Sequence, residues 1–417
     1  MSGTVISAVK GTKDILPGEI AAWQKAESAA KALFELYGYR ELRAPVFEMT
    51  ELFEKGTGTT SDIVTKEMYT FTDKGGRSVT LRPEYTPSVV RAAIEHSLHL
   101  KPEPMRFYFI GPMFRYDKPQ KGRYRQFHQI DVEVFGEKDA AVDAELISIA
   151  RELLEKLGVG ETETLINSVG CRACRPAYSA AMREAAGSRL ESLCPDCRRK
   201  AELNPLRIFD CKVESCRAEA AGFPRITDHI CGECRAHFEE LQACLDTLGL
   251  KYTVEPRLVR GLDYYTRTTF EITAAGLGAQ NSLLGGGRYD DMIKNFGGPD
   301  LAATGFAMGM ERLLAVVPPP LEERRVVYLA PIGREALRAS LDIARFFRRN
   351  GIECLLEFKD KGLKSHLGRA ARLNAAWALI IGDDELASGR LKLKDMATGE
   401  QREGRREELL EILFRQP

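Results

Sequence analysis

The sequence lacks any long run of apolar residues. Short apolar stretches such as Trp377 to Ile381 fall far below the roughly 18 residues that a membrane-spanning helix requires. The first residues, MSGTVISAVKGTKD, also lack the apolar core of a secretion signal. Both absences lead us to expect a cytosolic protein without a membrane partner.

The sequence also lacks a low-complexity tract and an excess of either charge. Sixty Lys and Arg balance 60 Asp and Glu, and 44% of the residues are hydrophobic, which argues against the disordered and fibrous classes. A nucleic-acid partner would therefore be met by local basic patches. One patch is Arg115 to Gln126, with five cationic residues and one acid, and another is 324–417, with 19 basic and 14 acidic residues. Each could instead be an ordinary solvated surface.

At 417 residues the chain is longer than one hydrophobic core usually serves, so we expect two or three domains. Residues 106–135 have the pattern of two strands joined by a long basic loop, which predicts a hairpin. Hydrophobic periodicity and Gly or Pro boundaries predict the other elements of this part: helices at 19–37, 139–157 and 306–316, strands at 41–48, 164–169 and within 252–273, a glycine-rich turn at 285–287, and a mostly helical segment at 171–250.

Three consecutive prolines, Pro318 to Pro320, predict a linker because they can neither continue a helix nor pair in a sheet. Beyond them, the strand-like runs RVVYLAPIG, IECLLEF and AWALIIG alternate with helices predicted at 334–349 and 361–375. This alternation indicates a separate α/β domain. We therefore expect one domain at 1–170 with 251–320, a second at 171–250, and a third at 324–417.

Ten cysteines are present, and eight of them lie between positions 171 and 234. Three CxxC pairs among them are the commonest half-site of structural zinc, and a cytosolic chain rarely holds disulfides. We expect one or two zinc sites of four thiolates each, and the alternative is a set of free thiols. Cys244 and Cys354 are expected to be isolated buried thiols. The candidate ligands are Cys171, Cys174, Cys194, Cys197, Cys211, Cys216, Cys231 and Cys234.

The predicted hairpin carries the first candidate for chemistry. Arg115 stands on a strand and Arg123 in the basic loop, and guanidinium groups suit phosphate oxygens because they donate in pairs. Together with Asp117 and Phe127, these arginines resemble the second signature motif of class II aminoacyl-tRNA synthetases. The resemblance implies that Arg115 binds the α-phosphate, Arg123 the distal phosphates, and Phe127 the adenine ring of ATP. Asp117, where the class more often has glutamate, would accept from the adenine amino group.

Two further stretches resemble the other signatures of the class. GFAMGMERL at 305–313 resembles the third, with Arg312 placed to stack on adenine and to meet a distal phosphate. Its small residues let the backbone approach a nucleotide. ELRAPVFE at 41–48 resembles the first signature, which forms the dimer interface in this class, so the resemblance implies a homodimer.

Five longer strings narrow the resemblance to the histidyl-tRNA synthetase family. They are KGTKDILP at 10–17, LRPEYTPSVVR at 81–91, PQKGRYRQFHQ at 119–129, LVRGLDYYTRTTFE at 258–271 and GGGRYD at 285–290. The resemblance implies a histidine–tRNA ligase that makes the aminoacyl adenylate from L-histidine and ATP with Mg²⁺ and then charges tRNA(His). The implied fold class is α+β, with the antiparallel sheet core of a class II synthetase, a helical cysteine-rich insertion and a C-terminal α/β anticodon-binding domain.

The resemblance also implies the residues of a histidine pocket. A cationic amine and an imidazole are best held by carboxylates and hydroxyls in fixed places. Such a pocket rejects apolar analogues because they would leave its buried polar groups unpaired. By the resemblance, Glu84, Thr86 and Gln129 hold the ammonium group, Glu133 and Tyr264 meet the imidazole, and Tyr265 lines the pocket.

Arg260, in the RGLDYY string, is the residue that we expect to carry catalysis. Attack of the histidine carboxylate on the α-phosphorus builds negative charge on the equatorial oxygens, and a fixed guanidinium stabilises that transition state more than the ground state. Arg115 and Arg260 would clamp the α-phosphate from two sides and bind the histidine carboxylate. The sequence identifies no general base for transfer to tRNA.

Two alternatives to this enzyme remain open. One is a catalytically inactive regulatory subunit of ATP phosphoribosyltransferase, although such proteins typically lose the RGLDYY string and the anticodon-binding domain. The other is an RNA-binding protein without chemistry, which would have no need of an imidazole-shaped pocket. In the enzyme, the C-terminal domain would read unstacked anticodon bases. The loop near Gln120, and the cysteine-rich insertion by its position, are candidates for contacting the acceptor end of the tRNA.

Overall fold

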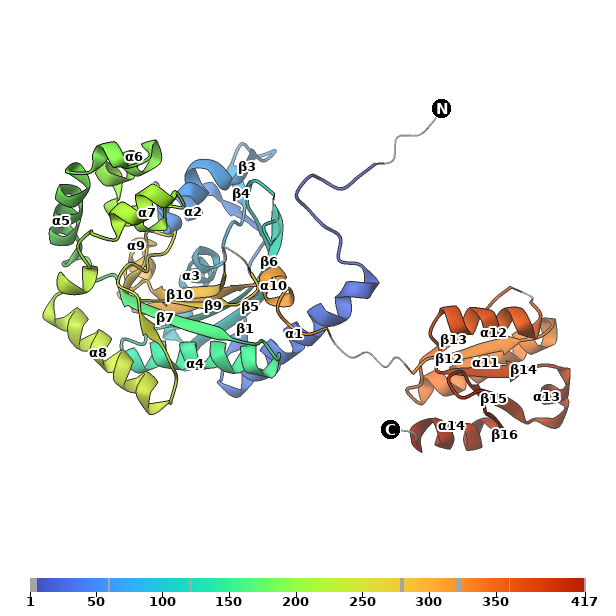
Figure 1. Cartoon of the computed structure of the whole chain (residues 1–417). Coiled ribbons are helices and arrows are strands. Elements are labelled where there is room, and N and C mark those ends of the chain that lie inside the picture. Colours follow the sequence, from blue (N-terminus) through green and yellow to red (C-terminus); the bar gives the residue numbers. More distant parts are fainter. Residues whose placement is uncertain are drawn as a thin grey trace, which may run out of the picture. The chain divides into compact units, whose positions relative to one another are not determined.

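The computed structural model describes residues 6–58, 61–119, 122–277, 281–319, 325–359 and 361–415. It divides into two compact units, Met1–Pro320 and Leu321–Pro417 (Figure 1). Gln120, predicted to lie near the acceptor end of the tRNA, and Pro320 of the predicted linker fall outside the described residues.

The first unit is built on an eight-stranded sheet with the order β1-β5-β6-β11-β10-β9-β7-β8. Its six central strands pair antiparallel, whereas the edge pairs β1 with β5 and β7 with β8 are parallel. The predicted hairpin is confirmed as β5 and β6. The strands are β1 (Arg40–Glu41), β5 (Met105–Phe114), β6 (Gln126–Phe135), β7 (Thr162–Ser168), β8 (Thr253–Val254), β9 (Thr266–Ala274), β10 (Ser282–Arg288) and β11 (Ala303–Gly309).

One face of this sheet carries the main hydrophobic core. Side chains alternate along a strand, so Ile130, Val132 and Val134 of β6 all point into this core and are fully buried or nearly so. The intervening polar residues of β6 face the opposite side. The helices that cover the apolar face are α1 (Pro17–Leu36), α4 (Ala140–Lys156) and α8 (Gly232–Thr247) (Figure 1).

The segment predicted as one strand at 41–48 is two short strands in different sheets. Pro45 lies at the break, and the carbonyl oxygens of Ala44 and Pro45 accept hydrogen bonds from Nη1 of Arg82, at 2.9 and 3.2 Å, in place of ladder bonds. The second piece belongs to an antiparallel sheet with the order β2-β4-β3. The elements of this region are β2 (Phe47–Met49), α2 (Thr50–Thr57), η1 (Ile63–Glu67), β3 (Tyr69–Thr72), β4 (Ser78–Leu81), α3 (Thr86–Glu95) and η2 (Leu98–Leu100).

The predicted glycine-rich turn at 285–287 is wrong, because these glycines lie inside β10. Strand β10 pairs with β9 on one side and β11 on the other. A β-carbon on Gly286 would overlap the carbonyl oxygen of Gly305 in β11, so the close approach requires glycine. The helix predicted at 306–316 is likewise wrong at its start. Residues up to Gly309 belong to β11, and α10 spans only Met310–Leu314.

The cysteine-rich segment is mostly helical, as predicted, and packs around a small core of its own. That core includes Tyr178, Met182, Cys197 and Ile208, and it extends to Tyr265 beside β9. The elements before α8 are α5 (Arg175–Gly187), η3 (Leu190–Ser192), α6 (Pro195–Leu203), η4 (Pro205–Asp210), α7 (Glu214–Ala220) and η5 (Ile226–Asp228), and α9 (Met292–Asn295) follows β10.

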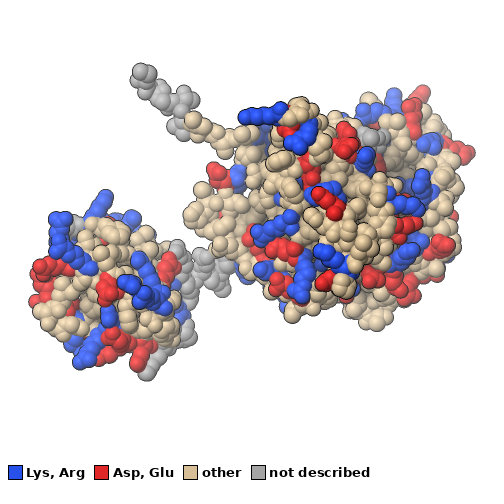
Figure 2. All heavy atoms as spheres, turned by 180° about the vertical axis from the view of Figure 1, so that it is seen from behind, with Lys and Arg blue, Asp and Glu red and all other residues tan. Residues whose placement is uncertain are grey.

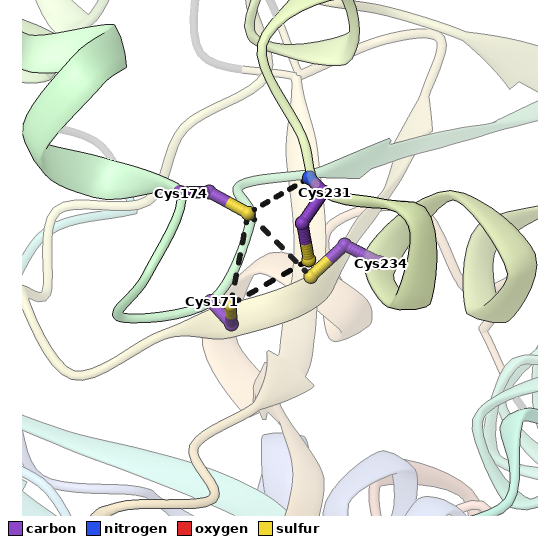
Figure 3. A group of neighbouring side chains, drawn as sticks. All are labelled: Cys171, Cys174, Cys231 and Cys234. Carbon is purple, nitrogen blue, oxygen red and sulfur yellow. Dashed lines mark hydrogen bonds between the residues drawn. The ribbon is translucent and has the colours of Figure 1, made fainter.

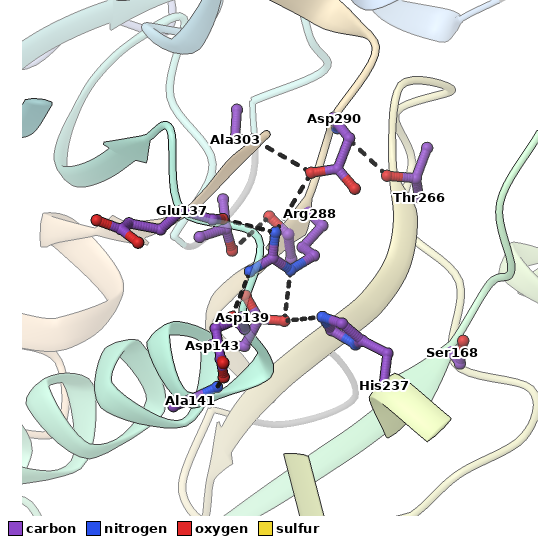
Figure 4. Close-up of polar contacts among 12 residues, drawn as sticks. Glu137, Asp139, Ala141, Asp143, Ser168, His237, Thr266, Arg288, Asp290 and Ala303 are labelled. Atoms are coloured by element: carbon purple, nitrogen blue, oxygen red, sulfur yellow. Dashed lines mark hydrogen bonds and ion pairs between the residues drawn. The ribbon is translucent and has the colours of Figure 1, made fainter. Parts of the chain in front are cut away.

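A buried charged network joins β10 to α4 and α8 (Figure 4). Nε of Arg288 donates to Oδ2 of Asp143 at 2.8 Å, and its other nitrogens donate to the carbonyl oxygens of Glu137 and Asp139 at 3.0 and 2.7 Å. His237 of α8 lies 3.6 Å from the same Asp143 oxygen. Burial, reinforced by the charge of Arg288, lowers the pKa of His237 to about 4, so the ring is neutral near pH 7. The network therefore fastens β10 to the start of α4, and the neutral ring of His237 packs beside it.

The second unit is a five-stranded mixed sheet flanked by helices. Its order is β13-β12-β14-β15-β16, parallel among the first three strands and antiparallel among the rest. The alternation of strands and helices predicted up to position 381 is confirmed, and the final hairpin was not predicted. The elements are β12 (Val327–Pro331), α11 (Arg334–Arg349), β13 (Cys354–Leu356), α12 (Leu363–Arg372), β14 (Trp377–Ile381), α13 (Asp383–Ser388), β15 (Leu391–Asp395), β16 (Gln401–Gly404) and α14 (Arg406–Arg415).

Acidic and basic side chains are interspersed over the surface of both units in the view of Figure 2. This mixing agrees with the balanced composition of the chain. Among the described residues, no helix has the length and apolar character needed to cross a membrane.

Candidate active site

Glu84 is a buried carboxylate between β4 and α3, and two hydroxyl groups donate to it. Oγ1 of Thr57 lies 2.7 Å from Oε1, and the hydroxyl of Tyr264 lies 3.0 Å from Oε2. Burial raises the pKa of Glu84, while the hydrogen bond from Thr57 and the charge of Arg115 oppose that rise. The two predicted pocket residues Glu84 and Tyr264 are therefore in direct contact.

Glu133 of β6 is the second buried carboxylate. Oγ1 of Thr86 donates to its Oε1 at 2.5 Å, and the hydroxyl of Tyr289 donates to Oε2. Burial raises the pKa of Glu133 to about 8. A β-carbon on Gly305, its pairing neighbour on β11, would overlap Oε2, so glycine is needed there. The structure brings Thr86 to Glu133, whereas the resemblance had grouped Thr86 with Glu84.

The polar face of β6 continues from Glu133 through Asp131 to Gln129. Within the described part of the chain, Oδ2 of Asp131 and Oε1 of Gln129 are buried acceptors without a hydrogen-bond donor. Burial, with the nearby carboxylates of Glu133 and Glu84, raises the pKa of Asp131 well above its ordinary value. Buried acceptors without donors are costly, so this face is suited to a ligand that brings N–H groups.

The aromatic side of the pocket comes from three tyrosines. The rings of Tyr264 and Tyr265 lie 4.7 Å apart, and those of Tyr264 and Tyr289 lie 5.5 Å apart. Burial raises the pKa of Tyr265 to about 12, so its hydroxyl stays protonated. Tyr264 and Tyr289 thus each donate a hydrogen bond to one of the two carboxyl groups, and the ring of Tyr265 lies against Tyr264.

Arg260 forms an ion pair with Glu271 of β9, and its guanidinium lies against Gly285. Burial lowers the pKa of Arg260, but the charge of Glu271 and of neighbouring acids outweighs burial, and the net effect raises it. A β-carbon on Gly285 would overlap the guanidinium. The glycine of β10 therefore makes room for the arginine.

Arg115 lies beside the segment that carries Glu84 and contacts Phe127. Its Nε donates to the carbonyl of Pro83 at 2.8 Å, and its guanidinium carbon lies 5.2 Å from the centre of the Phe127 ring. Asp117 pairs with Arg123 at 3.0 Å, although the resemblance had assigned it to adenine.

Arg312 of α10 completes the predicted ATP-binding set. Its Nη1 donates to the carbonyl of Ser282 at 2.8 Å. Burial, then the charge of Arg123, and more weakly those of Arg260 and Arg115, lower the pKa of Arg312. The other three predicted arginines therefore lie near enough for their charges to act on Arg312. We call the four the arginine cluster: Arg115, Arg123, Arg260 and Arg312.

Four residues of the site were not singled out from the sequence: Thr57, Asp131, Glu271 and Tyr289. Asp131 carries a signal that strand periodicity could have used, because it alternates with Gln129 and Glu133 on one face of β6. Glu271 and Tyr289 stand within two of the strings on which the resemblance rested. Thr57 lies in none of those strings, and only the fold brings it to Glu84.

The eight cysteines form two groups of four. The sulfur atoms within each group all lie within 4.8 Å of one another. We call Cys171, Cys174, Cys231 and Cys234 the first cysteine group, shown in Figure 3. Cys194, Cys197, Cys211 and Cys216 are the second cysteine group. All ten cysteines of the chain are free thiols in the structure, and Cys354 is buried whereas Cys244 is only partly buried.

Comparison with known proteins decides the family. Residues 11–313 match the histidyl-tRNA synthetase family, and residues 326–416 match the anticodon binding domain family. A histidine–tRNA ligase from Caldanaerobacter subterraneus subsp. tengcongensis is 49% identical over 401 residues, which cover 95% of this chain and 96% of that protein. The chain belongs to the histidyl-tRNA synthetase family.

Other members of the histidyl-tRNA synthetase family agree over the whole length. A histidine–tRNA ligase from Solibacter usitatus is 47% identical, with 97% of this chain and 98% of that protein covered. The crystal structure of apo S. aureus histidyl-tRNA synthetase superposes with a TM-score of 0.82 at 35% identity, covering 98% of this chain and 100% of the other. The predicted fold class and the predicted enzyme, a histidine–tRNA ligase, are thereby confirmed.

The regulatory alternative gains no comparable support. A Bacillus halodurans structure titled as an ATP phosphoribosyltransferase regulatory subunit/histidyl-tRNA synthetase has a TM-score of 0.64 and 20% identity, covering 91% of this chain and 99% of the other. A likeness at that identity shows the shared fold alone. The ligases are both more similar in sequence and equally complete in coverage.

Proposed function

We propose that histidine–tRNA ligation takes place in the pocket around Glu84 and Glu133, next to the arginine cluster. The observation that carries this proposal is the pairing of two buried carboxylates, each held by hydroxyl donors, with guanidinium groups on one side. A pocket of this kind offers acceptors to a cationic amine and an imidazole, and donors to a carboxylate and phosphates. Histidine and ATP together present all four groups.

The ammonium group of histidine would bind Glu84 and Gln129. Asp131, whose Oδ2 has no donor among the described residues, lies next to Gln129 on the same face of β6. Each of these side chains offers an acceptor oxygen, and an ammonium group brings three N–H donors. The imidazole would reach Glu133, whose carboxylate is oriented by Thr86 and Tyr289. Tyr264 and Tyr265 would line the pocket around the ring. A competitor without these polar groups would leave the buried carboxylates unpaired.

The first half-reaction needs no side-chain nucleophile. A carboxylate oxygen of histidine attacks the α-phosphorus of ATP, the bond to pyrophosphate breaks, and the aminoacyl adenylate forms. Arg115 and Arg260 would stabilise the negative charge that develops on the α-phosphate. Arg123 and Arg312 would bind the distal phosphates, and Phe127 would stack on adenine. ATP would bind with Mg²⁺, which would supply positive charge to the pyrophosphate leaving group.

The adenine contact of Asp117 requires a change of partner, because Asp117 pairs with Arg123 in the unliganded chain. Phosphates would attract Arg123 and release the carboxylate. In the second half-reaction, the acyl group passes to the terminal ribose hydroxyl of tRNA(His) and AMP leaves. Residues 324–417 would bind the anticodon, the insertion 171–250 would lie near the acceptor stem, and the catalytic domain would comprise 1–170 and 251–320.

Each cysteine group would hold one structural Zn²⁺. Three Sγ–Sγ distances in the first group run from 3.6 to 4.0 Å, and the sulfurs of Cys194 and Cys211 lie 3.9 Å apart in the second. A tetrahedral site with Zn–S bonds of about 2.3 Å places its sulfurs about 3.8 Å apart. The backbone amides of Cys231 and Cys194 also donate to the sulfurs of Cys174 and Cys216, both at 3.1 Å. Thiolates at this spacing fit the ion well.

The proposal includes a cytosolic homodimer. The family resemblance implies that the stretch 41–48 forms the dimer interface. Val46 and Phe47 of this stretch are exposed in the single chain, and so is Met49, which directly follows it. Covering them with a second copy would bury apolar surface.

ATP–pyrophosphate exchange against each of the twenty amino acids tests the function. Exchange with histidine alone is the expected result. Exchange with another amino acid, or with none, would contradict the assignment of the pocket. In the latter case, binding to ATP phosphoribosyltransferase would be measured next.

A further inference from the structure

The loop from Arg260 to Tyr265, here called the 260–265 loop, is held by the insertion. Nδ2 of Asn204 donates to Oδ1 of Asp263 at 2.8 Å, and Nε of Arg207 lies 3.5 Å from the same oxygen. Arg207 also donates through Nη2 to the carbonyl of Gly261. The loop carries Arg260 and Tyr264, two residues of the proposed reaction, and the insertion contacts the residues next to both of them.

Arg207 is a buried guanidinium, with only 6% of its surface exposed. A buried charge is tolerated only when its partners stay in fixed geometry. Asp263 also contacts Gly58, where an added β-carbon would meet Oδ2 at 2.8 Å. Gly58 directly follows Thr57, which donates to Glu84. Asp263 itself directly precedes Tyr264. The contact between Arg207 and Asp263 is therefore one residue away from each of the two donors to Glu84.

Arg207 lies in η4 and Asn204 stands between α6 and η4, and these two elements are too short to hold this position alone. Helix α6 has nine residues and η4 has six, and isolated helices of this length are marginal in water. Asn204 and Arg207 both lie between Cys197, which is in α6, and Cys211, which follows η4. These two cysteines belong to the second cysteine group, so a shared metal ion would close the segment into a loop with Asn204 and Arg207 in its middle.

We propose that metal bound to the second cysteine group sets the position of the 260–265 loop through Asn204 and Arg207, and so controls the rate of histidine activation. The inference rests on the proposed function and on the proposed metal sites. Asn204 and Arg207 are positioning residues, because they act on the reaction through Asp263 and Gly261. Removal of this metal lowers kcat without removing any residue that touches histidine or ATP.

The test compares three variants of the full chain: Arg207→Met, Cys216→Ser, and both together. Metal content is measured by replacing zinc with Co²⁺ and recording the thiolate-to-cobalt absorption. Activity is the kcat of histidine-dependent ATP–pyrophosphate exchange. Arg207→Met keeps both cobalt sites, whereas Cys216→Ser loses one. Each lowers kcat on the order of 10- to 100-fold, because small displacements of catalytic groups have effects of that size.

The double variant shows whether the metal and Arg207 act on kcat together or independently. If metal and Arg207 act along one path, the double variant is no slower than the slower single variant. Two losses that multiply would overturn the proposal. A wild-type kcat in Arg207→Met with both cobalt sites filled would also overturn the proposal. Because this result needs only Arg207→Met, the test stays valid if Cys216→Ser does not fold.

Matched controls come from the same insertion. Arg199 lies on α6, is exposed and pairs with Asp196, so Arg199→Met should retain metal and kcat. Cys244→Ser removes a thiol outside both groups and should also retain them. Histidine-dependent exchange by the wild-type chain, measured in parallel, tests the proposed function separately from the coupling.

Discussion

The hydroxyl of Tyr264 donates to Oε2 of Glu84 at 3.0 Å, across a separation of 180 residues. Tyr264 belongs to the 260–265 loop and Glu84 precedes helix α3, so this bond joins two strings that the sequence presents far apart. Thr57 donates to the other oxygen of the same carboxylate. One carboxyl group thus collects donors from two distant parts of the chain.

Replacing Tyr264 by Phe should raise the KM for histidine roughly 10- to 100-fold, because a hydrogen bond to a charged group contributes about 1.5 to 3 kcal/mol. The KM for ATP should not change. Histidine-dependent pyrophosphate exchange measures both constants. Tyr252→Phe is the matched control, since Tyr252 packs against the main core and lies outside the pocket. An unchanged KM for histidine in Tyr264→Phe would remove Tyr264 from the binding set.

Replacing Arg260 by Ala should lower kcat for adenylate formation by a factor on the order of 10² to 10³, the usual effect of losing one donor to a developing oxyanion. The fold should survive, because Arg260 is partly exposed. Arg257→Ala is the matched control. Arg257 is an exposed arginine three positions earlier, and it pairs with Glu255. Near-normal exchange by Arg260→Ala would contradict its catalytic role.

Glu133→Gln should change how stability depends on pH. The pKa of Glu133 is raised to about 8 in the folded chain from an ordinary value of 4.5. Between these values the unfolded chain has lost the proton and the folded chain keeps it, so wild-type stability falls as pH rises through this window. Above about pH 8 the penalty is fully present.

The amide in Glu133→Gln carries no such penalty. The variant should therefore match wild type near pH 5 and exceed it near pH 8.5 by at least about 1.4 kcal/mol, the free energy of one pKa unit. Thermal unfolding at the two pH values measures the difference, and activation of histidine should be lost at both. A stability difference that stays constant with pH would show that Glu133 does not hold its proton in the fold.

The sequence alone predicted the helices and strands with strong hydrophobic periodicity. It also predicted most site residues that lie within the five stretches resembling the family. The hairpin of β5 and β6 has clear strand patterns on both sides, and the buried residues of α11 recur at helical spacing from Ala336 to Phe347. The glycines at 285–287 misled the prediction, because a run of glycines usually marks a turn. Here Arg260 and Gly305 approach β10 from elsewhere in the chain, and only the tertiary structure shows why β-carbons are excluded there.

The same limit applies to the site. The sequence could suggest that Glu84 and Glu133 bind histidine, but it could not show which hydroxyls hold them. Thr57 and Tyr289 are separated from their carboxylates by 27 and 156 positions. The grouping of the eight cysteines is likewise a property of the fold, because the first cysteine group joins pairs that lie on either side of the second group in the chain.

Alanine at two adjacent glycines of β10 should separate a catalytic effect from a structural one. At Gly285, the added β-carbon would overlap the guanidinium of Arg260, which is the far end of a flexible side chain and can move. At Gly286, it would overlap the carbonyl oxygen of Gly305, which is backbone inside the sheet and cannot move without disturbing β11.

We therefore expect Gly285→Ala to keep most of its thermal stability while kcat falls, since Arg260 leaves its place beside Glu271. Gly286→Ala should instead destabilise the first unit by about 1 to 3 kcal/mol or more, the usual effect of overpacking. Thermal unfolding and pyrophosphate exchange on both variants measure the two effects. If Gly285→Ala retained full kcat, Arg260 could act from a displaced position, and the close fit of its guanidinium against β10 would have no part in catalysis.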